Sequence, residues 1–445
     1  MLKTFSIGGV HPHENKLSAH QSIIIAGVPE KVVILLGQHI GVPAKPVVAK
    51  GDVVKVGTLI AEAGGFVSAA VHSSVSGKVA KVDSIVDASG YAKSAIFIDV
   101  DGDEWEESID RTPDLVKECD LSAEEIIRKI ADAGIVGLGG ACFPAQVKLT
   151  LPPSAKAECL IINAVECEPY LTADHQLMLE HAEEIMVGVN ILMKAVKVNK
   201  AFIGIENNKP DAIELMTKVA SEYAGIVVVP LKVQYPQGGE KQLVNAIMSR
   251  QVASGALPIS VGAIVQNVGT AYAVYEAVQK HKPLFERVVT VTGKAVKQPS
   301  NIMARIGTPM KQLIDVCGGL PENTGKIVSG GPMMGKALVN TDVPTSKGCS
   351  GILIMNAKEA KRGEAKSCIR CGKCVGACPM GLEPYLLSVL SENGDFERME
   401  KEHIMDCIEC GSCQFTCPAR LPLLDYCRLG KAKVGAMIRS RQAKN

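Results

Sequence analysis

Two cysteine runs near the C-terminus constrain this chain more than any other feature. The runs are Cys368-x-x-Cys371-x-x-Cys374-x-x-x-Cys378-Pro379 and Cys407-x-x-Cys410-x-x-Cys413-x-x-x-Cys417-Pro418. This spacing is typical of proteins that hold two 4Fe-4S clusters, because soft thiolates are the ligands that iron–sulfur clusters prefer. A pair of structural zinc sites or disulfides is the alternative, but zinc sites commonly take two of their ligands from a distant segment. The runs therefore predict a protein that moves electrons.

The spacing also predicts which cysteines share a cluster. In two-cluster proteins of this kind, the fourth cysteine of each run binds the other cluster. We expect one cluster on Cys368, Cys371, Cys374 and Cys417, and the second on Cys407, Cys410, Cys413 and Cys378. The other cysteines show no common spacing, and we interpret most of them as ordinary buried thiols. They are Cys119, Cys142, Cys159, Cys167, Cys317, Cys349 and Cys427.

Composition limits the class of protein and its partners. The chain has 445 residues, and 47% of them are hydrophobic, so it can build several buried cores. A formal net charge of +1 argues against nucleic acid as the main partner. Fifteen cysteines without a disulfide pattern favour a reducing compartment. The uncharged stretch 251–275 is interrupted by proline and glycine, so we expect no transmembrane helix and only peripheral membrane association.

The N-terminal third is predicted to be an all-β module. Residues 1–20 carry three histidines and are interpreted as a solvated arm. Turn signals then punctuate short β-branched runs up to about residue 100. The segment resembles the barrel-sandwich hybrid of lipoyl and biotinyl domains, with Gly65-Phe66-Val67-Ser68 where those carriers have their lysine. We therefore predict a docking or structural module over residues 1–105.

The middle of the chain is predicted to be a doubly wound α/β domain, residues 120–280. Ser122-x-x-Glu125 is a capping box that opens a helix over 123–133. Strands and helices then alternate, which is typical of a parallel sheet covered on both faces. The predicted strands are Cys159–Asn163, Ala201–Ile205 and Ile226–Leu231, and the predicted helices cover 174–197, 210–222 and 240–250.

Three further segments complete the predicted organisation. Residues 285–345 return to β character, the cluster-binding region covers 358–427, and a basic tail covers 428–445. The tail carries six lysines or arginines after Cys427 and no acidic residue. It is either a solvated tail or a contact for an anionic membrane or partner.

Four segments of the α/β region predict a second redox centre. Each places glycines, amides or acids at a turn, where a backbone can approach a phosphate closely or a sheet can bind a ligand at its carboxyl edge. The segments are Gly137-Leu138-Gly139-Gly140-Ala141-Cys142-Phe143-Pro144 with Lys148, Asn163-Ala164-Val165-Glu166-Cys167-Glu168-Pro169-Tyr170, Tyr235-Pro236-Gln237-Gly238-Gly239-Glu240, and Asn267-Val268-Gly269-Thr270. A surface loop is the alternative for any one of them alone.

These segments resemble the flavin-bearing, NADH-oxidising subunit of respiratory complex I. The order of the domains is more similar still to the C subunits of Rnf complexes, which are ion-translocating ferredoxin–NAD oxidoreductases. The resemblance covers essentially the whole chain and implies a multidomain α/β fold. Its parts would be an N-terminal β barrel-sandwich hybrid, a Rossmann-like FMN/NADH domain, a β-grasp domain and a C-terminal, helical, ferredoxin-like domain with two clusters.

The resemblance also implies roles for single residues. Gly137, Gly139, Gly140 and Lys148 would line FMN and its phosphate, and Phe143 would stack on the nucleotide. Asn163, Glu166 and Glu168 would face the isoalloxazine and the nicotinamide, the two glutamates positioning and tuning the reaction centre without acid–base catalysis. Gly238, Gly239 and Glu240 would close the site, and Asn267 and Thr270 would hydrogen-bond the flavin. This chain departs from the complex I pattern at Leu138, Cys142 and Val165.

The expected function is that of a redox subunit with FMN, NAD(H) and two 4Fe-4S clusters. As implied by the resemblance, it would work in a membrane-bound Rnf complex that couples electron transfer between ferredoxin and NAD to Na+ or H+ translocation. It would lie peripherally on the cytoplasmic side of the cell membrane, contact other Rnf subunits, and have ferredoxin as a further candidate partner. The alternatives are a soluble diaphorase subunit of a hydrogenase or formate dehydrogenase, and a non-enzymatic iron–sulfur relay.

Overall fold

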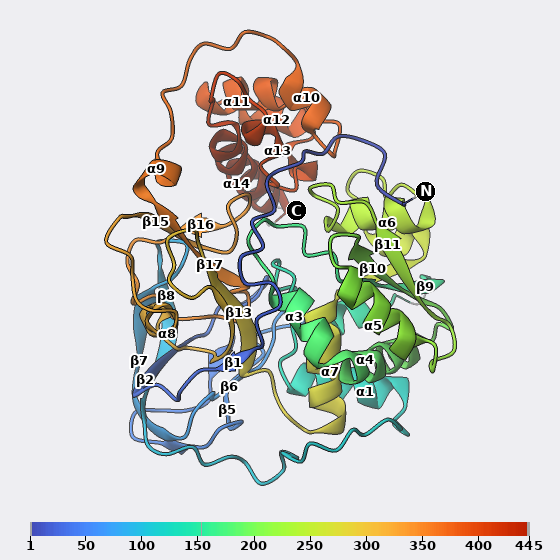
Figure 1. Cartoon of the computed structure of the whole chain (residues 1–445), viewed down its shortest axis with the longest axis vertical. Coiled ribbons are helices and arrows are strands. Elements are labelled where there is room, and N and C mark those ends of the chain that lie inside the picture. Colours follow the sequence, from blue (N-terminus) through green and yellow to red (C-terminus); the bar gives the residue numbers. More distant parts are fainter. Residues whose placement is uncertain (1, 153, 443–445) are drawn as a thin grey trace.

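The computed structural model describes residues 2–152 and 154–442, and Figure 1 shows their arrangement. The green helices and strands of the α/β region lie on one side, and the β-rich parts lie on the other. The orange and red helices of the cysteine runs gather at one end. The predicted multidomain α/β fold, with a separate helical region for the cysteine runs, is confirmed.

The first part is the β module that the sequence predicts. Two small antiparallel sheets, in the orders β2-β8-β7-β4 and β3-β5-β6, enclose a core that contains Val32, Ile60 and Ile96. Gly65 to Ser68 form the turn between β5 and β6, where the Phe66 side chain is 72% exposed. The strands are β2 (Lys31–Leu35), β3 (Lys45–Pro46), β4 (Val53–Val54), β5 (Leu59–Glu62), β6 (Val71–His72), β7 (Gly77–Val86) and β8 (Ala92–Val100).

The N-terminal arm, residues 2–30, includes the described part of the segment 1–20 predicted to be solvated, and it is bound at several points to the other parts. Lys3 bridges to Leu231, Val10 bridges to Tyr235, and the Gly9 N–H donates to the Ala377 carbonyl oxygen at 3.0 Å. Further along, β1 (Ile24–Ile25) pairs in parallel with β14. The interpretation of this segment as a solvated arm is therefore wrong, because its backbone groups are paired with strands and loops that sequence proximity does not reveal.

The α/β domain contains one parallel, four-stranded sheet in the order β11-β10-β9-β12. Its central strand β9 is buried on both faces. Leu160 and Ile162 belong to one core, whereas Ile161 belongs to the core beneath α6. The strands are β9 (Cys159–Asn163), β10 (Ala201–Glu206), β11 (Ile226–Leu231) and β12 (Ala263–Asn267).

The helices of this domain confirm most of the sequence prediction. The capping box of Ser122 and Glu125 is present at the start of α1. The predicted helix 174–197 is broken at His181 into α3 and α4, and neither proline nor glycine marks this break in the sequence. The helices are α1 (Ala123–Asp132), α2 (Ala145–Leu149), α3 (Ala173–Glu180), α4 (Ala182–Ala195), α5 (Pro210–Ala220), α6 (Glu240–Met248) and α7 (Val268–Gln279), with a 3-10 turn η1 (Pro258–Val261).

The third part is a mixed six-stranded sheet in the order β1-β14-β13-β17-β15-β16, so the N-terminal arm supplies one edge strand. Its core packs α8 against the sheet through Leu313, Ile314 and Ile352. The elements are β13 (Glu286–Thr292), β14 (Ser300–Arg305), β15 (Thr324–Ser329), β16 (Lys336–Ala337) and β17 (Gly351–Asn356), with α8 (Met310–Val316) and α9 (Ala357–Ala360).

The fourth part is a helical unit that holds both cysteine runs. Its elements are α10 (Lys373–Ala377), α11 (Pro384–Glu392), α12 (Phe396–Lys401), η2 (Ile404–Asp406), α13 (Ser412–Phe415) and α14 (Leu423–Gln442). The predicted basic tail begins inside α14 and stays helical to residue 442, and residues 443–445 lie outside the described residues. Over the described part of the chain, we find no helix with the length and apolar character needed to cross a membrane.

Candidate functional site

The polar site of the α/β domain forms where the strand order reverses. The chain builds outward from β9 to β10 and β11 and then returns to β12 on the other side of β9. Asn163 and Asn267 end these two strands and lie directly opposite each other. The carboxyl edge at such a reversal is where doubly wound sheets bind ligands. We call this region, bounded by the four predicted segments, the switch-point crevice.

The glycine loop 137–143 closes one side of the switch-point crevice. The Leu138 N–H donates to the Thr270 hydroxyl at 2.9 Å, and the Gly137 N–H donates to the Phe143 carbonyl oxygen at 2.9 Å. A Cβ on Gly139 would lie 3.3 Å from Asn267, whereas one on Gly140, at φ +122°, would meet open space. Within the described residues, the backbone N–H groups of Gly139, Gly140 and Ala141 find no acceptor. Three exposed donors in succession are suited to an anionic group.

The opposite side of the crevice is closed by the turn that precedes α6. The Asn163 side-chain amide donates to the Gly238 carbonyl oxygen at 2.8 Å. The Lys148 ammonium lies 2.5 Å from the Glu240 carboxylate and 3.2 Å from the Val265 carbonyl oxygen. The structure thus brings together Lys148 from one predicted segment and Glu240 from another, and pairs them with each other.

Both predicted acids of the second segment are held by backbone amides. The Glu166 carboxylate accepts from the N–H groups of Asp174 (2.8 Å) and His175 (3.2 Å) at the start of α3. The Glu168 carboxylate accepts from the N–H groups of Met333 (2.7 Å) and Met334 (3.0 Å) in the third part, and burial raises its pKa. Glu168 therefore fastens the crevice to the β-rich part of the molecule.

A buried carboxyl group completes the polar lining near Asn267. The Asn267 amide donates to the Asp174 carboxylate at 2.8 Å, while its oxygen caps α7 by accepting from Gly269. Burial, reinforced by the charge of Glu166, raises the pKa of Asp174 to about 7. The amide of Asn267 is thereby fixed with its oxygen toward the helix and its nitrogen toward Asp174.

The N-terminal arm adds a lysine that the sequence analysis did not identify. The Lys16 ammonium donates to the carbonyl oxygens of Glu166 (2.8 Å), Glu168 (3.0 Å) and Leu171 (2.7 Å). Burial, together with the charge of Lys209, lowers its pKa to about 8. No local signal marks this lysine, because its three partners lie about 150 residues away in sequence.

Beside this lysine lies a cavity of about 220 Å³, between the arm and the ends of β10 and β11. Glu206, the last residue of β10, lines it, and burial raises the pKa of this carboxyl group to about 7. The cavity borders the second predicted segment at Cys167 and Pro169. Its other lining residues are His11, Pro12, Glu14, Lys16, Asn208, Val233, Gln234 and Tyr235.

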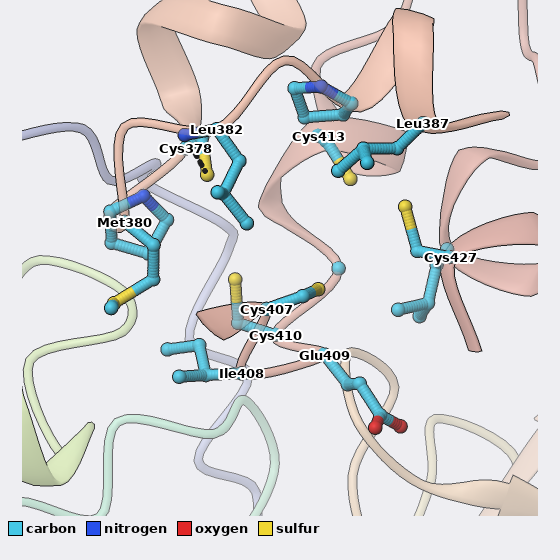
Figure 2. A pocket seen from close by; sticks show the side chains of 14 residues that line it. Cys378, Met380, Leu382, Leu387, Cys407, Ile408, Glu409, Cys410, Cys413 and Cys427 are labelled. Carbon is cyan, nitrogen blue, oxygen red and sulfur yellow. Dashed lines mark hydrogen bonds between the residues drawn. The ribbon is translucent and has the colours of Figure 1, made fainter. Parts of the chain in front are cut away.

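The four cysteines predicted for the second cluster line one pocket, which we call the second-cluster pocket. Figure 2 shows the thiol groups of Cys378, Cys407, Cys410 and Cys413 around a common space. Most of the remaining wall is apolar, including Leu382, Leu387, Ile408 and Leu424. Cys378 comes from the first run and the other three from the second, so the predicted exchange of the fourth cysteine fits this arrangement. Four thiols in an apolar wall are the donor set that a 4Fe-4S cluster requires.

The first cysteine run lies at the surface. Cys368 and Cys371 are exposed, and Cys374 and Cys417 are partly buried. Burial raises the pKa of Cys374. That Cys417 completes the first cluster stays a prediction. Both runs have the same backbone form, with left-handed residues at Arg370 and Glu409 after their first cysteines. Among the described residues, no three His, Cys, Asp or Glu side chains gather as a site for a single metal ion.

One loop connects the switch-point crevice to the second-cluster pocket. The Tyr235 hydroxyl donates to the Cys410 carbonyl oxygen at 2.8 Å. The Gln242 side-chain amide donates to the Pro379 carbonyl oxygen at 3.1 Å, beside Cys378. Gly238 of the same loop is the residue that Asn163 holds in the crevice. From the sequence, only the crevice contacts of this loop could be predicted, because nothing in its residues points to the cysteine runs.

Known protein families match the chain part by part. The RnfC barrel sandwich hybrid domain matches residues 3–103, the Nuo51 FMN-binding domain 130–276, the SLBB domain 288–337 and a 4Fe-4S dicluster domain 360–418. These matches cover the parts that hold the switch-point crevice and both cysteine runs.

Curated relatives match over almost the full length. The C subunit of the proton-translocating ferredoxin:NAD(+) oxidoreductase complex of Clostridium ljungdahlii is 49% identical, over 100% of this chain and 97% of that protein. The C subunit of the Na(+)-translocating complex of Acetobacterium woodii is 46% identical, over 97% of each chain. The C subunit of the ion-translocating oxidoreductase complex of Rhodobacter capsulatus is 44% identical, over 97% of this chain and 84% of that protein. Among solved structures, the air-oxidized NAD+-reducing (NiFe) hydrogenase matches with a TM-score of 0.49 and 18% identity, over 63% of this chain and 54% of that one.

Proposed function

This chain belongs to the family formed by the C subunits of ion-translocating ferredoxin:NAD(+) oxidoreductase (Rnf) complexes, and from that premise we propose that it exchanges electrons between NAD(H) and iron–sulfur clusters through a bound FMN. In this proposal it lies peripherally on the cytoplasmic side of the membrane, and the other members of the complex couple the electron flow to Na+ or H+ translocation.

The observation that carries the proposal is the loop 235–242. It touches the switch-point crevice through Gly238 and both cysteine runs through Tyr235 and Gln242. A flavin in the crevice and a cluster on Cys378, Cys407, Cys410 and Cys413 are therefore bound on two sides of the same loop. Contiguous, rigidly packed sites are what a protein must provide for cofactors that exchange electrons.

The residues of the crevice fit a flavin mononucleotide. The free N–H groups of Gly139, Gly140 and Ala141 suit its phosphate, while Lys148 is paired with Glu240 on the other side of the crevice. Asn163 and Asn267, at the ends of adjacent strands, would shape the place of the ring system by holding the Gly238 turn and the start of α7. When bound, FMN exchanges a hydride with the nicotinamide and single electrons with clusters. The protein's own residues supply binding and orientation, and no side chain acts as a nucleophile.

The cavity beside Lys16 is our assignment for the ribose end of the nicotinamide nucleotide. Glu206 ends the strand next to β9, and dinucleotide-binding sheets commonly use an acidic residue to accept hydrogen bonds from ribose hydroxyls. The cavity borders Cys167 and Pro169, which flank Glu168, so a ligand there would adjoin the crevice. Glu166 and Glu168 keep the positioning role that the resemblance gives them, by fixing the loop between cavity and crevice.

The two cluster sites differ in their distance from solvent. Cys378 and Cys410 are each 8% exposed, whereas Cys368 and Cys371 are exposed. We assign the exposed first run as the contact with another protein of the complex or with ferredoxin, and the buried second run as the contact with the flavin. The outward-facing arginine and lysine of the first run, Arg370 and Lys373, suit an acidic partner.

The test is anaerobic purification of the full chain, followed by cofactor analysis and titration with NADH. The proposal predicts about eight irons per chain, from two 4Fe-4S clusters, and one FMN, with bleaching of the cluster absorbance when NADH is added. A chain with the same iron content, but with no flavin after reconstitution and no response to NADH, would refute the dehydrogenase and leave an iron–sulfur relay.

A further inference from the structure

A fifth cysteine, Cys427, lies in the second-cluster pocket. It comes from α14 and not from either run, its side chain is only 2% exposed, and it lines the same space as the four predicted ligands. Figure 2 shows its thiol on the side of the pocket opposite Cys378 and Met380. The sequence predicts an ordinary buried thiol, because a position ten residues after Cys417 has no ligand spacing.

The inner face of α14 holds this thiol against the second run. Leu424, Cys427 and Lys431 are spaced three and four residues apart, so they share one face of the helix. Leu424 and Cys427 line the pocket, and the Lys431 ammonium donates to the Cys407 carbonyl oxygen at 2.5 Å. Cys427 and Cys407 line the same pocket. The helix therefore holds the backbone of Cys407 through Lys431 and places its own thiol in the same pocket.

Four ligands already complete a cubane, so the fifth thiol has another role. Hydrogen bonds to cluster sulfurs stabilise the more negative, reduced state and thereby raise the reduction potential. The two halves of the cysteine region also differ at the position that Cys427 occupies. Ten residues after Cys378 stands Ser388, which is the counterpart of Cys427 in the first half. Only the second half carries a thiol there, and this makes the two cluster sites chemically unequal.

We propose that Cys427 is a non-ligating thiol that donates its S–H to the Cys407 sulfur and sets the reduction potential of the second cluster above the value it would otherwise have. The proposal deepens the proposed function, since it requires that the second run binds a cluster. Through this bond, α14 gives the cluster site next to the flavin crevice a potential that is tuned separately from the exposed site.

The experiment is a redox titration of the reconstituted full chain, followed by electron paramagnetic resonance, for the wild type, Cys427→Ala and Cys427→Ser. Iron content is measured first, and Cys410→Ala identifies which signals belong to the second cluster. We expect full iron content in both Cys427 variants and a lower midpoint potential of the second cluster in Cys427→Ala. The midpoint of the first cluster should not change. Cys427→Ser keeps a hydrogen donor and should retain part of the wild-type value.

Two control variants separate tuning from general effects. Cys317→Ala removes an equally buried thiol from the third part, and Ser388→Ala changes the counterpart position in the first half. Neither should move the midpoint of the second cluster. An unchanged midpoint in Cys427→Ala with full iron overturns the tuning role, and loss of about half the iron overturns it by showing that Cys427 is a ligand. Absence of iron from the wild type itself would refute the proposed function instead.

Discussion

Lys347 is the buried group whose removal should have the clearest dependence on pH. It belongs to the third part, and its ammonium donates to the carbonyl oxygens of Ala70 (2.8 Å) in the β module and Gly134 (2.7 Å) in the α/β domain. Burial lowers its pKa from 10.5 to about 7. A neutral amine still has two N–H donors, which match these two carbonyl acceptors. The fold therefore satisfies the neutral form and disfavours the charged one.

The magnitude follows from proton linkage. Unfolding returns the lysine to its ordinary pKa, so between about pH 7 and pH 10.5 the unfolded chain binds more protons and stability rises with pH. With a folded-state pKa of about 7, this lysine costs about 4 kcal/mol near pH 7.5 and about 1.5 kcal/mol near pH 9.5. The Lys347→Met variant lacks this dependence. Its stability relative to the wild type should thus improve by about 2.5 kcal/mol when the pH is lowered from about 9.5 to about 7.5.

The assay is urea unfolding followed by the fluorescence of Trp105, the one tryptophan in the sequence. Its ring lies 5.3 Å from that of Phe285, which places the probe at the junction of the β module and the third part. Lys93→Met, which changes an exposed lysine of β8, is the matched control and should show no such difference. An equal stability difference for Lys347→Met at both pH values would refute the reasoning, because it would mean that Lys347 has the same pKa in both states.

Three further predictions concern the crevice, the cavity and the arm. Gly139→Val should lose flavin but keep its iron, because a side chain there meets Asn267 at 3.3 Å, and Gly27→Val, in open space, is the control. Glu206→Gln should raise the KM for NADH about tenfold, with flavin content unchanged, since a charged hydrogen bond contributes about 1.5 kcal/mol; an unchanged KM would refute the cavity assignment. Lys16→Met removes three hydrogen bonds, on the order of 3 kcal/mol in all, and should make the N-terminal arm sensitive to limited proteolysis, whereas the exposed Lys50→Met should not. Equal resistance of Lys16→Met and wild type would show that the arm is held by its other contacts.

The sequence predicted the elements of the fold better than their contacts. Strand β9 could be recognised because an apolar run between turn signals is the pattern of a strand buried on both faces, and the capping box of Ser122 marked the start of α1. The break at His181 could not be recognised, because no proline or glycine stands there and the flanking residues are compatible with a helix. The binding of the N-terminal arm could not be predicted either. Its partners are backbone groups of Tyr235 and Ala377, and backbone pairing leaves no pattern in the side chains.

In the candidate site, too, the sequence predicted which residues lie at the edge of the sheet but not which side chains contact each other. Asn163 and Asn267 could be assigned to one edge, because both end strands of a parallel sheet. Two other contacts could not be predicted, because each joins segments more than 90 residues apart. They are the bonds of the Glu168 carboxylate to the N–H groups of Met333 and Met334, and the pairing of Lys148 with Glu240.

The sequence by itself determined the chemistry of this protein. The spacing of eight cysteines predicts two sets of thiolate ligands, with the fourth ligand of each set drawn from the other run, as in two-cluster ferredoxins. Tertiary structure alone decided how these sets are placed. It buried one beside the loop 235–242, left the other exposed, and brought Cys427 into the buried pocket. The physical reason is that ligand spacing is a local property of the chain, whereas burial and proximity arise only when distant segments pack together.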